Sequence, residues 1–470
     1  MVTALLPMHR TDSERGQALR TLPSVDRLLQ HPLLLCVPRA LLVRQVRRCL
    51  DDAREKIEAG ELTAEAAATM FGGDAGARLL LAQCAVAAES RHRRVYNATG
   101  IVLHTGIGRA PLCGAAVAAL QQMAGYGFVE VDPKTGERDE RELGVAKLLC
   151  ELTGAGAALV VNNNAAATTL ALAALCAGRE VVVSRGELVE IGGGFRMPDV
   201  MKRAGCLMVE VGATNRTHLR DYEQAITKTT AALLKVHPSN FRIEGFTGTP
   251  PLAELGALAA ARGILLIDDL GSGLLIDTPI PLLEDEPSVS QSLAASANIV
   301  CFSADKLLGG PQCGILLGDR ERIAKVRAHP LYRALRCDKL TLAALEATLF
   351  VYRDGEPLHE IPSLRMLSAK EAELRARSEL LLKHLAVLGA HIVASESYAG
   401  SGANPARPLP SFAVAVPGGA ALCDRLRAAV PVPIFARVAA NHVVLDARTL
   451  LLEDLTNVAA GILQVVHEAR

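Results

Sequence analysis

Seven short apolar segments alternate with stretches of helical composition between residues 150 and 320. These predicted strands are residues 157–161, 180–183, 206–211, 231–236, 264–267, 298–302 and 314–317. Helical segments such as 165–176 and 251–261 lie between several of them. This alternation predicts a mostly parallel sheet that is covered by helices on both faces. Ligands bind such sheets beyond the carboxyl ends of the strands, so the polar residues at those ends are the first candidates for a functional site.

The composition is typical of an α/β enzyme. The chain has 470 residues, half of them apolar, which is enough for two or three hydrophobic cores. Lysine plus arginine equals aspartate plus glutamate, at 50 each, so a polyanionic partner has to be held by a local patch. Eleven cysteines without CxxC spacing indicate reduced thiols of a cytoplasmic protein and no metal site. The longest apolar stretch, 165–177, is too short to span a membrane.

A single lysine follows the strand predicted at 298–302. Lys306 lies three residues after Ser303 and directly before two leucines and a Gly-Gly-Pro turn. An amine reacts with a carbonyl cofactor when it is partly desolvated and held by a rigid turn, and these neighbours suit both requirements. Most lysines in such turns point into water, so the prediction of a Schiff-base lysine, with Ser303 beside the cofactor, depends on residues upstream.

Polar residues at the ends of three other strands are suitable companions for this lysine. Asn164, Ala165 and Ala166 lie where the strand 157–161 turns into an alanine-rich helix, whose exposed N–H groups can hold a phosphate. Asp268 follows the strand 264–267. If the carbonyl cofactor contains a pyridine ring, a carboxylate at this place can pair with its protonated nitrogen and keep the ring an electron sink. Donors able to meet a phenolate oxygen follow the strand 231–236: His237, Ser239 and Asn240.

The first 90 residues indicate a separate helical unit. Its predicted helices are 23–29, 38–59 and 63–88. In the second of these, Arg44, Arg47 and Arg48 recur at three- and four-residue spacing and therefore share one face. A cationic face of this kind can grip the phosphates of a nucleic acid. The alternative is an ordinary solvated face, because acidic residues follow at once.

Seven long blocks occur in a fixed order along the chain. They are YNATGIVLHTGIGRAPL, NNNAAAT, SRGELVEIGGGFRMPDV, GATNRT, VHPSNFRIEGFTG, IDDLGSG and FSADKLLGGPQCG. Together they resemble the bacterial L-seryl-tRNA(Sec) selenium transferases, a family of type I pyridoxal-phosphate enzymes. The resemblance covers essentially the whole chain. The usual family pattern has Asn-Leu where this chain has Gly106-Ile107, and Gly in place of Ala304; neither change touches a proposed reacting group.

The resemblance implies the α/β fold of type I pyridoxal-phosphate-dependent transferases, with a mostly parallel seven-stranded sheet. Three domains are expected: a helical tRNA-binding domain at 1–90, a cofactor-binding large domain at 91–340 and a small α/β domain at 341–470. The implied reaction converts L-seryl-tRNA(Sec) to L-selenocysteinyl-tRNA(Sec) with selenophosphate. The cofactor assists loss of the seryl hydroxyl, which leaves a dehydroalanyl intermediate to which selenium adds. The resemblance also implies a cytoplasmic homodecamer, with no metal and no membrane involved.

Particular residues receive roles from the same resemblance. Pyridoxal phosphate is expected on Lys306, which is then the natural base for the α-proton. Asp305 is expected either to assist departure of the hydroxyl or to cap a turn. Arg109, Arg333 and Arg336 match the arginines that the family uses for the oxyanion of the selenium donor. Arg333 and Arg336 are three positions apart and are expected to share a helical face; the alternative is a surface cluster.

Two other functions are compatible with parts of the sequence. One is a pyridoxal-phosphate lyase or transferase that acts on a small free amino acid or amino sugar with the same fold. The basic helical region at the amino terminus argues for an RNA-linked substrate instead, because a small-molecule enzyme does not need it. The other is an RNA-binding protein without catalytic activity, against which the presence of Lys306 and Asp268 argues.

Overall fold

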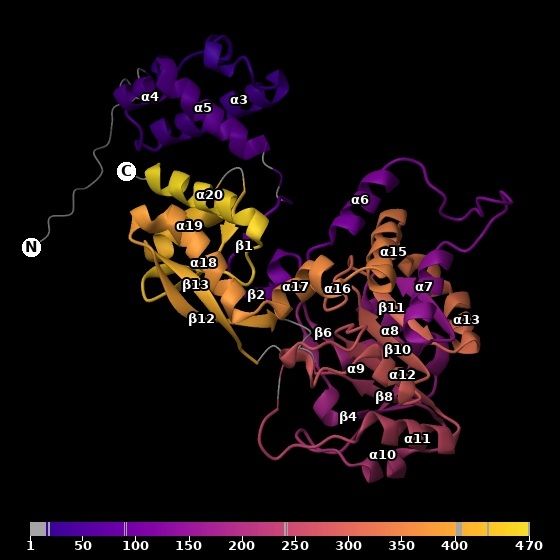
Figure 1. The fold of residues 1–470 in the computed structure, drawn as a ribbon. Helices are drawn as coiled ribbons and strands as arrows, with labels where there is room; N and C mark the ends of the chain where they lie inside the picture. Colours follow the sequence, from indigo (N-terminus) through magenta and orange to yellow (C-terminus); the bar gives the residue numbers. More distant parts are fainter. Residues whose placement is uncertain are drawn as a thin grey trace, which may run out of the picture. The chain divides into compact units, whose positions relative to one another are not determined.

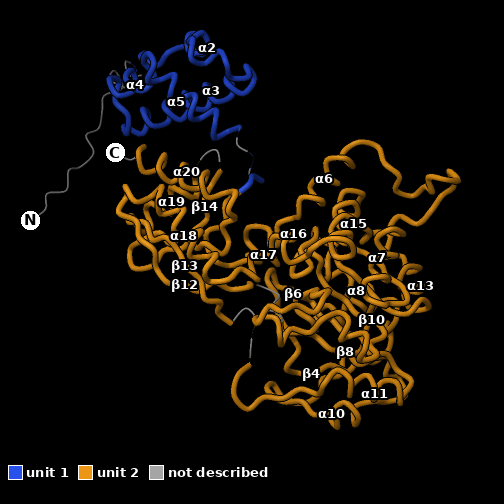
Figure 2. The backbone as a smooth tube through the Cα atoms, in the orientation of Figure 1, with its two compact units in different colours: residues 1–94 blue, residues 95–470 orange. Residues whose placement is uncertain are grey.

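The computed structural model describes residues 16, 19–88, 90, 92–238, 241, 243–400, 407–429 and 432–468. The chain divides into two compact units, residues 1–94 and residues 95–470 (Figure 2). Among the described helices, none combines the length and the apolar composition that a bilayer-crossing helix requires. All eleven cysteines are free thiols.

The first unit is helical in its described part (Figure 1). Its elements are α2 (Val25–Leu29), η1 (Pro32–Leu34), α3 (Arg39–Glu58), α4 (Ala64–Phe71) and α5 (Gly73–Ala88). Helix α3 packs against α5 through Leu42, Val46 and Leu50, which recur every four residues and are buried. Arg44, Arg47 and Arg48 lie on the exposed side of α3, as their spacing predicts.

The second unit is built around a seven-stranded sheet. In spatial order its strands are β3 (Ala157–Val161), β11 (Gly314–Gly318), β10 (Ile299–Ser303), β9 (Leu265–Gly271), β8 (Thr230–Val236), β4 (Glu180–Ser184) and β7 (Leu207–Val211). Strand β11 runs antiparallel to both of its neighbours, and the other adjacent pairs are parallel. The predicted mostly parallel seven-stranded sheet is therefore confirmed.

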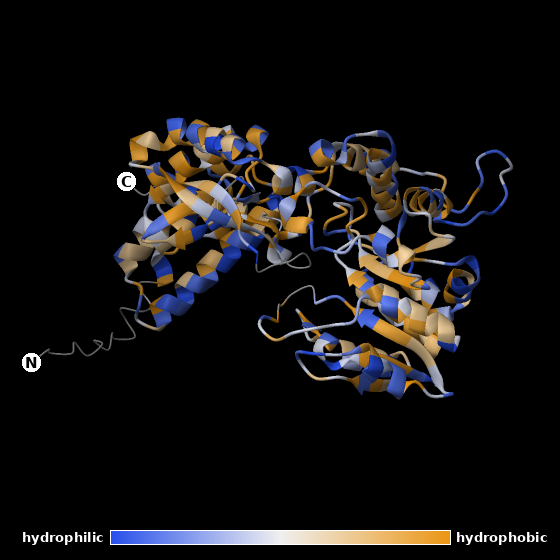
Figure 3. Ribbon diagram, turned by 60° about the horizontal axis from the view of Figure 1, so that its bottom comes forward, coloured by the Kyte–Doolittle hydropathy of each residue, from blue (hydrophilic) through white to orange (hydrophobic). Residues whose placement is uncertain are grey.

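Helices cover both faces of this sheet, so most residues of its strands are apolar (Figure 3). Residues that alternate along a strand point to opposite faces; in β10, Ile299 and Cys301 join one hydrophobic cluster, and Val300 and Phe302 join the other. The helices of this region are α6 (Gly114–Met123), α7 (Leu143–Thr153), α8 (Asn164–Cys176), α9 (Met197–Arg203), α10 (Leu219–Ala225), α11 (Leu252–Arg262), α12 (Val289–Ala294), α13 (Arg320–Ala328), α14 (Pro330–Leu335), α15 (Lys339–Asp354), α16 (Pro357–Glu360) and α17 (Pro362–Ser368).

A five-stranded sheet forms the carboxyl-terminal part of the second unit. Its order is β15 (Arg437–Ala439), β16 (His442–Asp446), β13 (Leu409–Pro417), β12 (His391–Gly400) and β2 (Ile101–Leu103). Helices α18 (Glu371–Leu385), α19 (Gly419–Arg427) and α20 (Leu455–His467) pack beside it. Strand β1 (Tyr96–Asn97) also pairs with β14 (Ile434–Phe435) in this region. Two segments from the start of the unit thus pair with strands near its end. Local sequence does not predict these long-range pairs.

Candidate active site

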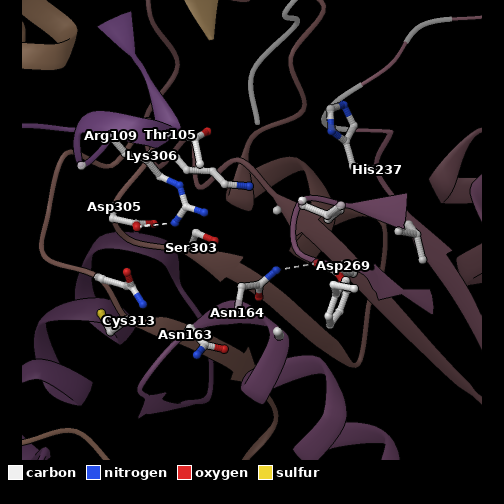
Figure 4. A pocket seen from close by; sticks show the side chains of 18 residues that line it. Thr105, Arg109, Asn163, Asn164, His237, Asp269, Ser303, Asp305, Lys306 and Cys313 are labelled. Atoms are coloured by element: carbon white, nitrogen blue, oxygen red, sulfur yellow. Dashed lines mark hydrogen bonds and ion pairs between the residues drawn. The ribbon is translucent and has the colours of Figure 1, made fainter. Parts of the chain in front are cut away.

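A cavity of about 370 Å³ opens at the carboxyl ends of β8, β9 and β10, the edge of the sheet at which ligands are expected (Figure 4). The amino end of β11, which is antiparallel, and the start of α8 meet at the same edge. The side chains that line it and can ionise, form hydrogen bonds or act as nucleophiles include Arg109, Asn163, Asn164, His237, Asp269, Ser303, Asp305, Lys306 and Cys313.

Lys306 lies in a tight turn directly after β10. Its side chain reaches the cavity, although the residue is only 7% exposed (Figure 4). Hydrogen bonds from Gly309 N to Lys306 O (3.1 Å) and from Leu307 N to Ser272 O (3.1 Å) fix the turn. Burial lowers the pKa of the Lys306 amine, and the positive charge of Arg109 lowers it further. A larger share of the amine is therefore neutral, and nucleophilic, at neutral pH.

Arg109 and Asp305 form an ion pair beside this lysine, with 2.5 Å between Arg109 Nη1 and Asp305 Oδ2. The Ala110 amide donates to the carbonyl oxygen of Asp305 at 3.2 Å, so the two segments also contact each other through the backbone. Arg109 has a φ of 61°, in the left-handed region, and its amide donates to His104 O at 3.1 Å. The structure thus brings together Arg109, Asp305 and Lys306, as the sequence predicts.

The expected carboxylate is Asp269, and the prediction of Asp268 requires correction. Strand β9 extends to Gly271, so both aspartates lie within it and point to opposite faces. Asp269 lines the cavity, where its carboxylate accepts hydrogen bonds from Asn164 Nδ2 (2.8 Å) and Thr168 Oγ1 (3.0 Å). Asp268 points away from it toward Ser292, and burial raises its pKa to about 6.

The start of α8 offers fewer free amides than expected. Asn163 is its N-cap, and its side-chain oxygen accepts the Ala166 amide at 2.8 Å. The Ala166 amide is therefore occupied, and Ala166 does not line the cavity. Asn164 and Ala165 do line it, and their amides belong to the first helical turn, where an amide has no partner within the helix. The prediction that Ala166 binds the cofactor is therefore wrong. Ser303 lies at the cavity as predicted; Ser239 and Asn240 lie outside the described residues.

Arg333 and Arg336 do not share a helical face, which corrects the expectation from their spacing. Helix α14 ends at Leu335, and Arg336 follows it in an extended conformation with a ψ of 147°. Arg336 Nη1 contacts Glu130 Oε1 at 3.3 Å, whereas Arg333 is exposed. Neither residue lines the cavity that contains Lys306.

Two site residues were difficult to identify from the sequence. Glu286 lies in a loop between β9 and α12 without any recognisable motif, yet its side chain is 2% exposed and its Oε1 is 3.9 Å from His237 Nε2. Burial raises the pKa of Glu286 to about 7. Burial, with Lys235 and Lys306 nearby, lowers the pKa of His237 to about 4, so its imidazole is neutral at neutral pH. Asn163 belongs to a predicted polar loop, but its role as N-cap emerges only from the helix boundary.

These residues fit a phosphorylated pyridine aldehyde. The cavity volume of about 370 Å³ lies within the usual range for small-molecule sites. Several buried polar atoms around it lack a hydrogen-bond partner among the described residues, including His237 Nδ1, Asn164 Oδ1 and Arg109 Nε. An amine, a buried carboxylate and a helix amino terminus meet the three functional groups of such a cofactor.

Comparisons with known proteins agree with this chemistry. The family model described as "L-seryl-tRNA selenium transferase" matches residues 95–451. Relatives named L-seryl-tRNA(Sec) selenium transferase include one from Moorella thermoacetica, 46% identical over 97% of this chain and 98% of the relative. The relative from Solidesulfovibrio magneticus is 48% identical over 95% of this chain and 97% of its own. The relative from Rhizobium meliloti is 45% identical over 92% and 95%.

The solved structure of D-glucosaminate-6-phosphate ammonia-lyase resembles this chain with a TM-score of 0.57 and 21% identity, covering 80% of this chain and 96% of that one. This likeness concerns the fold. Together with the sheet described above, it confirms the predicted α/β fold of type I pyridoxal-phosphate-dependent enzymes. The family resemblance predicted from the sequence is likewise confirmed: the chain belongs to the L-seryl-tRNA selenium transferase family.

Proposed function

We propose that this chain converts L-seryl-tRNA(Sec) to L-selenocysteinyl-tRNA(Sec), with selenophosphate as selenium donor and pyridoxal phosphate as cofactor. Family membership over nearly the full chain supports the reaction. The observation that carries the chemistry is a buried amine of lowered pKa, Lys306, in a cavity that also contains the Asp269 carboxylate and the start of α8. The bound cofactor supplies an electron sink that stabilises negative charge on the α-carbon of the seryl group.

Three groups hold the cofactor in this proposal. Lys306 binds its aldehyde carbon, and the amides of Asn164 and Ala165 bind its phosphate. Asp269 pairs with its pyridine nitrogen, and the hydrogen bonds from Asn164 and Thr168 fix the orientation of that carboxylate. Burial raises the pKa of Asp269, with these hydrogen bonds acting in the opposite direction, so a cationic pyridinium nitrogen is the partner that its ionised form needs.

Lys306 moves the proton in this proposal, and Asp305 assists it. The lowered pKa of Lys306 suits it to accept the α-proton of the seryl group as a neutral amine. Lys306 then gives that proton to the seryl hydroxyl, which departs as water, and Asp305, 5% exposed and paired with Arg109, assists the departure by orienting the hydroxyl. An oxyanion of the selenium donor competes with Asp305 for the Arg109 guanidinium, which couples arrival of the donor to release of the carboxylate.

The remaining partners are inferred from the family and from exposed charges. Arg44, Arg47 and Arg48 on α3 contact the phosphates of the tRNA. Arg333 and Arg336 lie outside the Lys306 cavity of their own chain, so their contact with the donor requires a neighbouring copy. This agrees with a homodecamer, and the whole assembly operates in the cytoplasm.

The direct test is to incubate the protein with seryl-tRNA(Sec), with and without selenophosphate, and to identify the esterified amino acid. Selenocysteine is expected only when the donor is present. Lys306→Ala is expected to abolish the product and the visible absorbance of the bound cofactor. Free serine serves as the control substrate. Equal turnover of free serine would contradict the proposal and favour a lyase acting on small amino acids.

A further inference from the structure

A second cavity, of about 380 Å³, lies next to the Lys306 cavity, and His237 lines both. Its wall is built largely from two segments that, apart from His237, do not line the Lys306 cavity: residues 213–217, and residues 237, 238, 241, 243, 247 and 248. The lining is rich in hydroxyl and amide groups, among them Thr214, Asn215 and Thr247. The cavity therefore combines these polar groups with apolar side chains such as Phe241 and Ile243, and it adjoins the Lys306 cavity.

Hydrogen bonds lock the two segments together. Thr217 N donates to Gly248 O at 2.9 Å, and Gly248 N donates to Asn215 O at 3.1 Å. The side-chain amide of Asn215 donates to Phe246 O at 2.5 Å. The Arg216 guanidinium lies over the Phe246 ring, 4.4 Å from its centroid, which fixes the orientation of a planar cation that lines the cavity. Unstacked RNA bases bind on such guanidinium planes and on aromatic rings.

Glu286 lines the second cavity, and its Oε1 lies 3.9 Å from Nε2 of His237, the residue that lines both cavities. Its side chain is 2% exposed, and its Oε1 has no hydrogen-bond partner among the described residues. Leaving a buried carboxylate oxygen unpaired is costly, so a ligand with a hydrogen-bond donor is favoured here. The other buried charges of the cavity, Lys235 and Glu187, already pair with each other at 2.5 Å. Lys306, whose charge also reaches Glu286, belongs to the first cavity.

We propose that the second cavity binds the terminal ribonucleoside to which the serine is esterified, with Glu286 accepting a hydrogen bond from the 2′-hydroxyl of the ribose and Arg216 stacking on the base. This inference rests on the proposed function. The ester bond joins the amino acid to the ribose, so the ribose has to lie next to the cavity that receives the seryl group, and His237 is the wall common to the two. Buried carboxylates recognise ribose hydroxyls in nucleotide-binding proteins in the same way.

The test combines a change in the RNA with a change in the protein. Seryl-tRNA(Sec) is prepared with a terminal adenosine or with 2′-deoxyadenosine, and kcat/KM for selenocysteine formation is measured in full-length holoenzyme. The wild type is expected to lose about ten-fold with the deoxy substrate. Glu286→Ala is expected to lose about ten-fold with the normal substrate and nothing more with the deoxy one. Arg216→Ala is expected to lose about ten-fold with both substrates, because base stacking does not depend on the hydroxyl.

Glu284→Ala is the matched control, because Glu284 is exposed in the same loop and does not line the cavity. Absorbance of the bound cofactor and thermal unfolding check that each variant is folded and loaded. If the wild type is active and its kcat/KM is the same for the normal and the 2′-deoxy substrate, this inference is overturned while the proposed function stands, whatever the variants do. The same holds if Glu286→Ala retains the full ten-fold discrimination. A wild type that makes no selenocysteinyl-tRNA overturns the proposed function and this inference with it.

Discussion

The side-chain amide of Asn164 donates a hydrogen bond of 2.8 Å to the carboxylate of Asp269, inside the cavity that Lys306 enters. Asn164 is the first residue of α8, and Asp269 lies in β9, 105 positions further along the chain. In the proposed cofactor site, Asn164 would offer its backbone amide to the phosphate, while its side-chain amide orients the Asp269 carboxylate. Cofactor binding and cofactor activation would then be coupled through one residue.

The two adjacent aspartates are expected to differ in function. Asp269→Asn removes the buried carboxylate from the cavity and is expected to lower kcat by about 100-fold, a usual loss for a preorganised electrostatic partner. Asp268→Asn is expected to leave kcat unchanged, because Asp268 points toward Ser292. Steady-state selenium transfer by both variants decides the assignment. Inactivation by Asp268→Asn, with Asp269→Asn active, would reverse it.

Asp268 is also expected to limit stability at neutral pH. Its folded pKa of about 6 lies above the unfolded value of about 3.9, so the folded state binds more protons between these values and stability falls as pH rises through them. Asp268→Asn is expected to raise the free energy of unfolding at pH 8 by about 2 to 3 kcal/mol. The gain should vanish at pH 3.5. Denaturant titrations at both pH values measure it, and an equal gain at each would point to a cause other than this carboxylate.

Arg109 is expected to set the pH range in which Lys306 reacts. Because the positive charge of Arg109 lowers the pKa of Lys306, Arg109→Gln should raise that pKa. The rate at which the cofactor-free protein takes up pyridoxal phosphate is then expected to reach half its maximum at a higher pH than in the wild type. Uptake is followed by visible absorbance. Arg138→Gln is the control, since the Arg138 side chain is 78% exposed and forms an ion pair with Glu130 outside the Lys306 cavity. An equal shift in both variants would exclude a local effect.

Gly309 is expected to be required for the position of Lys306. It has a φ of +76°, and an added Cβ would lie 2.2 Å from Ile361 Cγ2. Gly309→Ala therefore combines backbone strain with a steric overlap. Gly154→Ala is the matched control, because Gly154 has a φ of +75° but open space around its Cβ position. The control should lose about 1 to 2 kcal/mol of stability, and Gly309→Ala more, together with the cofactor absorbance. Equal losses in the two variants would mean that the overlap is relieved.

The arginines of α3 are expected to supply electrostatic affinity for tRNA. Replacing Arg44, Arg47 and Arg48 with alanine should weaken tRNA binding and reduce the slope of log affinity against log salt by about 2 to 3. The control variant carries the same loss of charge at three other exposed arginines of the first unit, Arg20, Arg27 and Arg78. Filter binding at several salt concentrations compares them. Equal changes in both variants would show that only net charge matters.

The strand and helix pattern of the large sheet was predictable from the sequence because it is local. Apolar runs bounded by polar and glycine-rich turns predict β3 at its observed residues and α8 to within one residue. Lys306, Arg109 and Asp305 were predictable as well, since each lies in a block that keeps its family pattern at that position. In these cases the identity of the residue and its neighbours in the chain carry the information.

The tertiary structure alone decided which of these side chains meet. Asp269 rather than Asp268 faces the cavity because β9 continues through both residues, and a shift of one position along a strand reverses the face. The amide of Ala166 is occupied because α8 begins at Asn164. Glu286 reaches His237 from a loop with no motif, along a chain path that local sequence does not encode. Direction and proximity depend on register, helix boundaries and packing, which are properties of the folded chain as a whole.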